Sequence, residues 1–139
     1  MLNFFKKKDE FSIEDQESFV EVACLLIHAS KIDEHYTEDE KDIITKTLIK
    51  FGADKDNITN IITKAEIIEK NSNQILDFTK KIKEIEQEKK IIIVTALWEI
   101  IYSDSKSDMF EANLMRRLTG LLYLDPKVVG DLKKKFNKN

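Results

Sequence analysis

The scarcity of glycine and proline limits this chain to folds that need few sharp turns. Three glycines and one proline occur among 139 residues, whereas sheet proteins use these residues in the many turns that join their strands. Hydrophobic residues make up 42% of the chain and charged residues 35%, which is typical of a globular protein rather than a disordered one. We therefore predict an all-α fold with long helices and short connections.

Helix start signals divide the sequence into about seven helices. Thr37 with Glu40 has the spacing of a capping box, and Gly52 has the place of a glycine just past a helix end. The fifth predicted helix is apolar on most sides, so we expect it at the centre of a compact bundle. Apolar residues at helical spacing follow start signals near Ile13, Thr37, Asp54 to Asp56, Ser72, Glu86, Asp108 and Asp125.

The length and the absence of a low-complexity linker predict one domain over residues 12–139. We expect residues 1–11 to form a flexible N-terminal segment, because chain ends are commonly frayed. Aromatic and basic side chains within residues 1–8 allow at most a peripheral membrane contact. The longest apolar run, residues 91–98, is far shorter than the ~20 residues that a membrane-spanning helix needs.

The net charge of −3 and the pI of about 5.5 argue against a nucleic-acid-binding protein, which normally carries a basic surplus. Cys24 is the only cysteine, so no disulfide can form within the chain. The start of the sequence places apolar residues before basic ones, which is the reverse of a secretory signal. We therefore expect a cytoplasmic protein.

Two segments of the chain align when the sequence is shifted by 71 residues, so that residues 25–40 match residues 96–111. Each segment ends an apolar helix, continues with Asp, six further residues and Glu, and then opens the next helix. Asp33 thereby matches Asp104, and Glu40 matches Glu111. The sequence thus predicts two pseudo-repeated helix–loop–helix elements.

The duplicated acids allow two interpretations. If the two elements pack about a pseudo-twofold axis, Asp33, Glu40, Asp104 and Glu111 converge, and four close carboxylates need a counter-charge. A divalent cation such as Ca²⁺ or Mg²⁺ prefers oxygen ligands and would supply that charge. Alternatively, both glutamates are capping-box residues and both aspartates are turn residues, with no ligand involved.

At these residues the chain resembles the TerB-like family, named for tellurite-resistance protein B, over about residues 19–136. That family's pattern is Ala-Asp-Gly followed after five residues by Glu, present twice, with Ala-Leu-Trp-Glu before the second copy. This sequence has Ala-Leu-Trp-Glu at residues 96–99, then Asp104 and Glu111. The family's glycine is replaced by Glu34 and by Ser105, so both loops can adopt different backbone angles.

The resemblance implies a compact seven-helix TerB-like domain over residues 12–139, an acidic metal site and a link to tellurite or other stress responses. Similar domains are attached to J-domain co-chaperones, which implies protein interaction. Phosphate loops, nucleophile elbows and His-Glu-x-x-His motifs are missing from the sequence. We therefore expect a non-catalytic module that binds a divalent cation, with a protein-interaction adaptor as the alternative and a hydrolase using the same acids as the weakest possibility. The sequence leaves the oligomeric state open.

Overall fold

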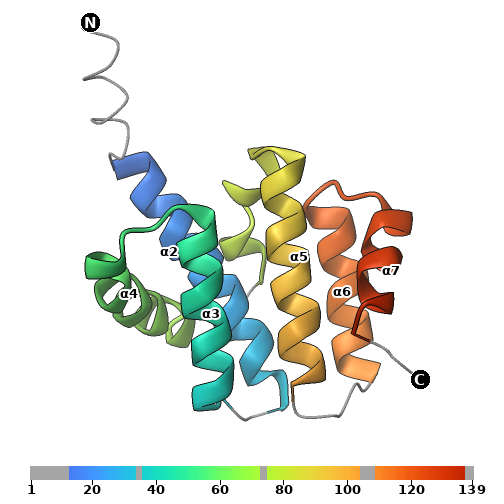
Figure 1. Ribbon diagram of the computed structural model, residues 1–139, viewed down its shortest axis with the longest axis horizontal. Helices are drawn as coiled ribbons and strands as arrows, with labels where there is room; N and C mark the ends of the chain where they lie inside the picture. The colour runs from blue at the N-terminus through green and yellow to red at the C-terminus, as the bar shows by residue number, and fades with distance from the viewer. Residues whose placement is uncertain (1–12, 34–35, 73–74, 104–108, 137–139) are drawn as a thin grey trace, which may run out of the picture.

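The computed structural model describes residues 13–33, 36–72, 75–103 and 109–136, and these ranges contain α-helices and 3-10 helices but no strand (Figure 1). The predicted all-α class is therefore confirmed. The α-helices are α2 (Ile13–Ser30), α3 (Glu38–Phe51), α4 (Ile58–Lys70), α5 (Gln87–Tyr102), α6 (Met109–Leu121) and α7 (Pro126–Lys134). The short 3-10 helices are η1 (Lys31–Asp33), η2 (Lys55–Asn57), η3 (Ile75–Phe78) and η4 (Ile82–Glu84).

The helix ends follow the capping signals. The Thr37 backbone N–H donates to Glu40 Oε1 at 2.8 Å, and the Glu40 backbone N–H donates to Thr37 Oγ1 at 3.1 Å, which completes a capping box. Gly52 ends α3 with a φ of 112°, a left-handed conformation that glycine adopts without a steric penalty. Asp125 accepts a hydrogen bond from the Lys127 backbone N–H, with proline at the first position of α7.

The fourth predicted helix, which was expected to begin at Ser72, is wrong in detail, because η3 and η4 take its place. Two apolar residues of this segment, Phe78 and Ile82, are nevertheless buried. The Glu21 carboxylate accepts hydrogen bonds from the backbone N–H groups of Lys81 and Ile82, at 2.7 and 3.0 Å. A distant side chain thus takes the donors that a continuous helix would direct to its own carbonyls.

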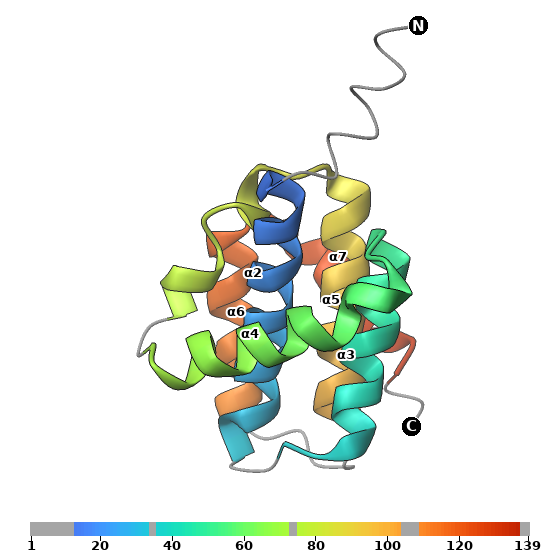
Figure 2. The ribbon, with the colours of Figure 1, turned by 90° about the vertical axis from the view of Figure 1, so that its left-hand side faces the viewer.

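Two helices, α2 and α5, form the middle of the bundle. The predicted central position of α5 is confirmed, because it buries side chains on several sides and packs against α2, α3 and α7. Helix α2 is enclosed as fully, since residues 22–27 are consecutive and each is at most 1% exposed. In Figure 2, α4 crosses in front of α2, against which it packs extensively.

The two helix–loop–helix elements have the same direction in the bundle. Helices α2 and α5 run downward in Figure 1, whereas α3 and α6 run upward. The C-terminal ends of α2 and α5 and the N-terminal ends of α3 and α6 therefore lie at one end of the bundle in both ribbon views. Among the described helices, none has the length and apolar character that crossing a bilayer requires.

Candidate functional site

The structure describes the side chain of one of the four predicted metal-binding acids, Glu40. Asp104 lies outside the described residues. Asp33 belongs to η1 and Glu111 to α6, but their side chains also lie outside the described part of the structure. Within the described residues, no three His, Cys, Asp or Glu side chains are grouped so that they could hold a metal ion. A four-carboxylate site therefore stays a prediction.

Glu40 is a buried carboxylate at the shared end of the bundle. Its side chain is 3% exposed, although it lies in the first turn of α3. Oε1 accepts hydrogen bonds from the Thr37 backbone N–H at 2.8 Å and from Thr37 Oγ1 at 3.2 Å. The helix dipole of α3 also favours a negative charge at this position. The capping interpretation of Glu40 is thus confirmed.

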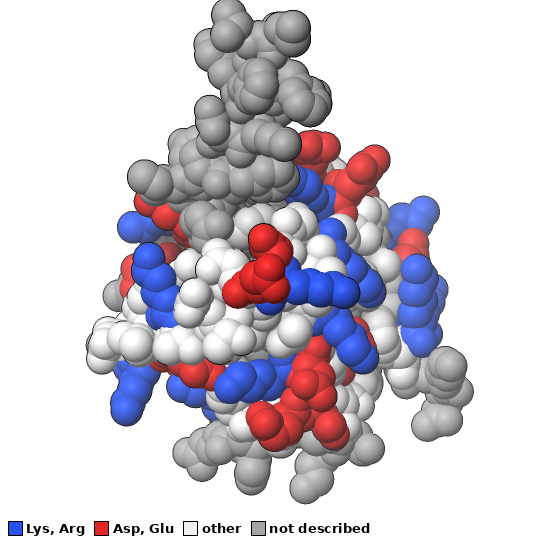
Figure 3. Space-filling model, turned by 60° about the vertical axis from the view of Figure 1, so that its left-hand side comes forward, with Lys and Arg blue, Asp and Glu red and all other residues white. Residues whose placement is uncertain are grey.

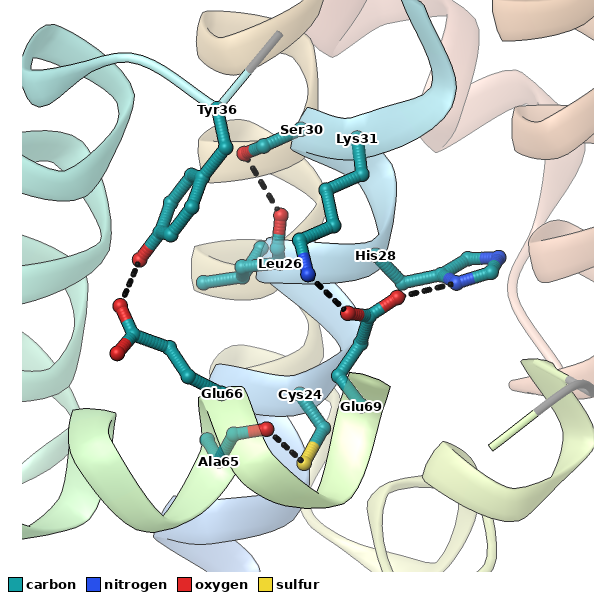
Figure 4. Close-up of polar contacts among 9 residues, drawn as sticks. All are labelled: Cys24, Leu26, His28, Ser30, Lys31, Tyr36, Ala65, Glu66 and Glu69. Atoms are coloured by element: carbon teal, nitrogen blue, oxygen red, sulfur yellow. Dashed lines mark hydrogen bonds and ion pairs between the residues drawn. The ribbon is translucent and has the colours of Figure 1, made fainter. Parts of the chain in front are cut away.

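A cluster of polar side chains joins α2 to α4 beside the connection between α2 and α3 (Figure 4). The Glu69 carboxylate, buried at the end of α4, accepts a hydrogen bond from Lys31 Nζ at 2.7 Å. Its other oxygen lies 3.2 Å from His28 Nδ1. His28 lies in the last turn of α2 and Lys31 follows that helix directly. The helix dipole favours the positive charge of Lys31 at this end. The cluster thereby holds the end of α2 against α4.

A second carboxylate of α4, that of Glu66, contacts Tyr36 just before α3 and Lys41 in α3. Glu66 Oε2 accepts a hydrogen bond from the Tyr36 hydroxyl at 3.1 Å and lies 3.4 Å from Lys41 Nζ. Burial, and next the hydrogen bond to Glu66, raise the pKa of the Tyr36 hydroxyl. Tyr36 thus stays a neutral hydrogen-bond donor. Through Tyr36 and Lys41, Glu66 connects α4 to the segment that precedes α3 and to the beginning of α3 itself.

The sequence analysis did not predict the contacts of Glu69 and Glu66, although the position of Glu69 in the sequence gives a signal for its contact. Residues 58, 61, 62 and 65 form the buried stripe of α4, and Glu69 continues it at the next position. Lys90 likewise occupies the buried stripe of α5, where it is 2% exposed and donates to the Leu122 carbonyl at 2.8 Å. A charged residue on a buried stripe predicts a specific partner, because an unpaired buried charge is very costly.

Cys24 and His28, four residues apart on α2, do not share a site. The Cys24 thiol is buried and donates to the Ala65 carbonyl at 3.5 Å, whereas His28 faces Glu69. Burial, followed by the nearby charges of Glu69 and Glu21, raises the Cys24 pKa to about 12. Because the thiolate is the reactive form, Cys24 is a poor nucleophile and a poor metal ligand at neutral pH.

The surface on the α4 side of the molecule carries both positive and negative side chains. In Figure 3, Lys and Arg side chains are interspersed with Asp and Glu side chains on the face toward which α4 lies. Such a mixed surface produces little long-range attraction for a highly charged macromolecule.

Trp98 connects α5 to the C-terminal helix. It is buried, and its Nε1–H donates to the Val129 carbonyl at 3.0 Å. This tryptophan is the third residue of the Ala-Leu-Trp-Glu segment at residues 96–99. The sequence matches the family described as "Tellurite resistance protein TerB" over residues 19–134. The chain belongs to the TerB family.

The TerB match covers every described helix from most of α2 to the end of α7. The resemblance inferred from the duplicated acids and the tryptophan segment is therefore confirmed. Searches of the curated proteins and of the solved structures found no match to this chain.

Proposed function

We propose that this TerB-family chain is a non-catalytic module that binds a divalent cation through Asp33, Glu40, Asp104 and Glu111. One observation supports the proposal most directly. The flanking ends of both helix–loop–helix elements lie at the same end of the bundle (Figures 1 and 2). Asp33 and Asp104 follow α2 and α5 closely in the sequence. If α2 and α5 ended at opposite ends of the bundle, the two aspartates could not share a site.

The chemistry of the donor set fits a hard cation. All four side chains offer carboxylate oxygens, which Ca²⁺ and Mg²⁺ prefer over nitrogen or sulfur. Glu40 is already desolvated by the fold and is held by Thr37, so less side-chain entropy is lost when it binds a cation. A link to tellurite or another stress response, and a location in the cytoplasm, belong to the same proposal and are suggested by the family and by the single cysteine.

Calorimetry and thermal unfolding with Ca²⁺, Mg²⁺ and Mn²⁺ test the proposal. We expect saturable heat with at least one of these ions. At a free cation concentration about one hundred times the dissociation constant, the folded state should gain about 2.7 kcal/mol. The absence of both heat and a change in melting temperature up to millimolar cation would contradict the proposal.

Glu40→Gln separates the two roles of this side chain. The amide oxygen of glutamine still accepts the Thr37 N–H hydrogen bond, so the cap of α3 should survive. The negative charge is lost, so cation affinity should fall by at least about tenfold, or about 1.4 kcal/mol. Asp104→Asn should have a similar effect. The matched control is Glu88→Gln, an exposed residue in the first turn of α5 at the opposite end of the bundle.

The alternative function is a protein-interaction adaptor in which the acids serve only as helix caps and surface contacts. The capping box of Glu40 favours it, because that contact explains this carboxylate without a ligand. Under this alternative, Glu40→Gln and Asp104→Asn leave the cation titrations unchanged. The same pair of variants therefore decides between the two functions.

A further inference from the structure

Residues of α6 and α7 line a groove. These two helices lie on the side of the molecule away from α4 (Figure 1). The volume of the groove is about 470 Å³, and its walls come from both helices. Buried apolar side chains form part of its lining, among them Trp98, Met115 and Val129. The groove is therefore open to solvent at its mouth and apolar at its base, as in sites that accept an amphipathic helix.

The walls of the groove are basic. Arg116 lies on the α6 side and Lys133 on the α7 side, where its Nζ is 5.4 Å from the centre of the Trp98 ring. Within the described residues, neither of these side chains has a carboxylate partner. Residues 112–136 contain six lysines and arginines against two aspartates, although the whole chain has a net charge of −3. This local reversal of sign favours an acidic occupant.

Two helical glycines, Gly120 and Gly130, also line the groove. Neither has a positive φ, and a Cβ atom added to either would meet no atom within 4 Å. Packing within this chain therefore does not require glycine, and glycine is less favourable than alanine inside a helix. Glycines at such positions allow another backbone to approach closely.

We propose that this groove binds an acidic amphipathic helix of a partner protein. The apolar stripe of that helix occupies the base of the groove, its backbone approaches Gly120 and Gly130, and its carboxylates face Arg116 and Lys133. The proposal concerns a different surface from the cation site and does not depend on it.

Fluorescence titration with synthetic peptides tests the proposal, because Trp98 is the only tryptophan and lines the groove. The probes are peptides of about 15 residues, long enough to form a helix, with a stripe of alanine, leucine or phenylalanine. One set has glutamate on the remaining faces, and a matched set has lysine. We expect a saturable change in Trp98 emission with a glutamate peptide and an affinity at least about tenfold weaker for its lysine counterpart.

Substitutions within the groove should separate binding from folding. Gly130→Ala and Gly120→Ala should raise the melting temperature and weaken glutamate-peptide binding by at least about tenfold. Arg116→Glu should reverse the preference between the two peptide sets. The matched control is Asn113→Ala, an exposed position on α6 that does not line the groove and also gains helix propensity.

Four outcomes would overturn the proposal. The first is no saturable binding by any glutamate peptide up to millimolar concentration, and the second is equal affinity for the glutamate and lysine sets. The third is unchanged binding in both glycine variants. The fourth is a Trp98 response to vesicles of anionic phosphatidylglycerol, or to self-association measured by sedimentation, without a response to the peptides.

Discussion

Three charged side chains that are buried or half-buried in this protein bond to residues far away in the sequence. Glu69, Lys90 and Glu21 each bond to a residue at least 32 positions away in the sequence. A residue's own sequence neighbours can show that it faces the core, but they do not identify a partner so far along the chain. Sequence reasoning therefore predicted Glu40, whose partner is three residues away, and missed the other three.

Glu21 leads to a prediction about pH. Burial raises the pKa of the Glu21 carboxyl above its ordinary value of 4.5, although the Ile82 and Lys81 N–H groups oppose this shift. A raised folded-state pKa means that the unfolded state loses its proton first as pH rises, so stability falls between 4.5 and the folded pKa. Glu21→Gln keeps an acceptor without the charge, so its stability relative to the wild type should increase across this window. Urea unfolding between about pH 4 and 8 measures the difference.

Two further variants serve as controls for Glu21. Glu21→Ala leaves the Lys81 and Ile82 N–H groups without their acceptor, and should cost about 1–3 kcal/mol at every pH. Glu17→Gln removes only a surface ion pair with Lys81 and should cost less than about 1 kcal/mol. If Glu21→Gln is as destabilised as Glu21→Ala, the interpretation of this carboxylate is wrong.

At the scale of the helices, prediction succeeded where the signal is local. The starts of α3 and α7 agree with the capping residues that predicted them, because a cap and its helix are adjacent in sequence. The apolar residues of the segment that contains η3 and η4 have helical spacing, which predicts a single helix there. The actual form of this segment depends on Glu21, which is 60 residues from Lys81, and no local pattern contains that information.

Gly52 and Gly130 should respond in opposite ways to substitution by alanine. Gly52 has a φ of 112°, which alanine adopts only with strain, so Gly52→Ala should lower the free energy of unfolding by about 1 kcal/mol or more. Gly130 lies inside α7 with space around a Cβ atom, so Gly130→Ala should raise it by about 0.5–1 kcal/mol. Thermal or urea unfolding measures both, and changes of the same sign would contradict this assignment of backbone strain.

For the whole molecule, the family and the all-α class were predictable, but the ligand site was not. Duplicated spacing and the tryptophan segment identify the family because they are properties of the sequence. Whether Asp33, Asp104 and Glu111 converge depends on how the α2–α3 and α5–α6 connections lie relative to each other. The side chains of these three acids lie outside the described residues. The common direction of α2 and α5 supports convergence without measuring it.

The protein should unfold in one cooperative transition. One cluster of buried residues extends from α2 through α7, so no helix has a core of its own. Trp98 fluorescence reports the α5–α7 contact and far-UV circular dichroism reports all helices. The two signals should give the same urea midpoint and a free energy of unfolding of about 5–15 kcal/mol. Loss of the fluorescence signal at lower urea would show instead that α7 detaches first.

The enclosure of α2 on every side has a consequence for fragments of this chain. Residues 22–27 are covered by three helices, since α2 packs against α3, α4 and α5. A fragment containing only α2 and α3 would expose the sides of α2 that α4 and α5 cover, and water would wet those side chains. Such a fragment would therefore self-associate or stay unfolded rather than form a stable monomer.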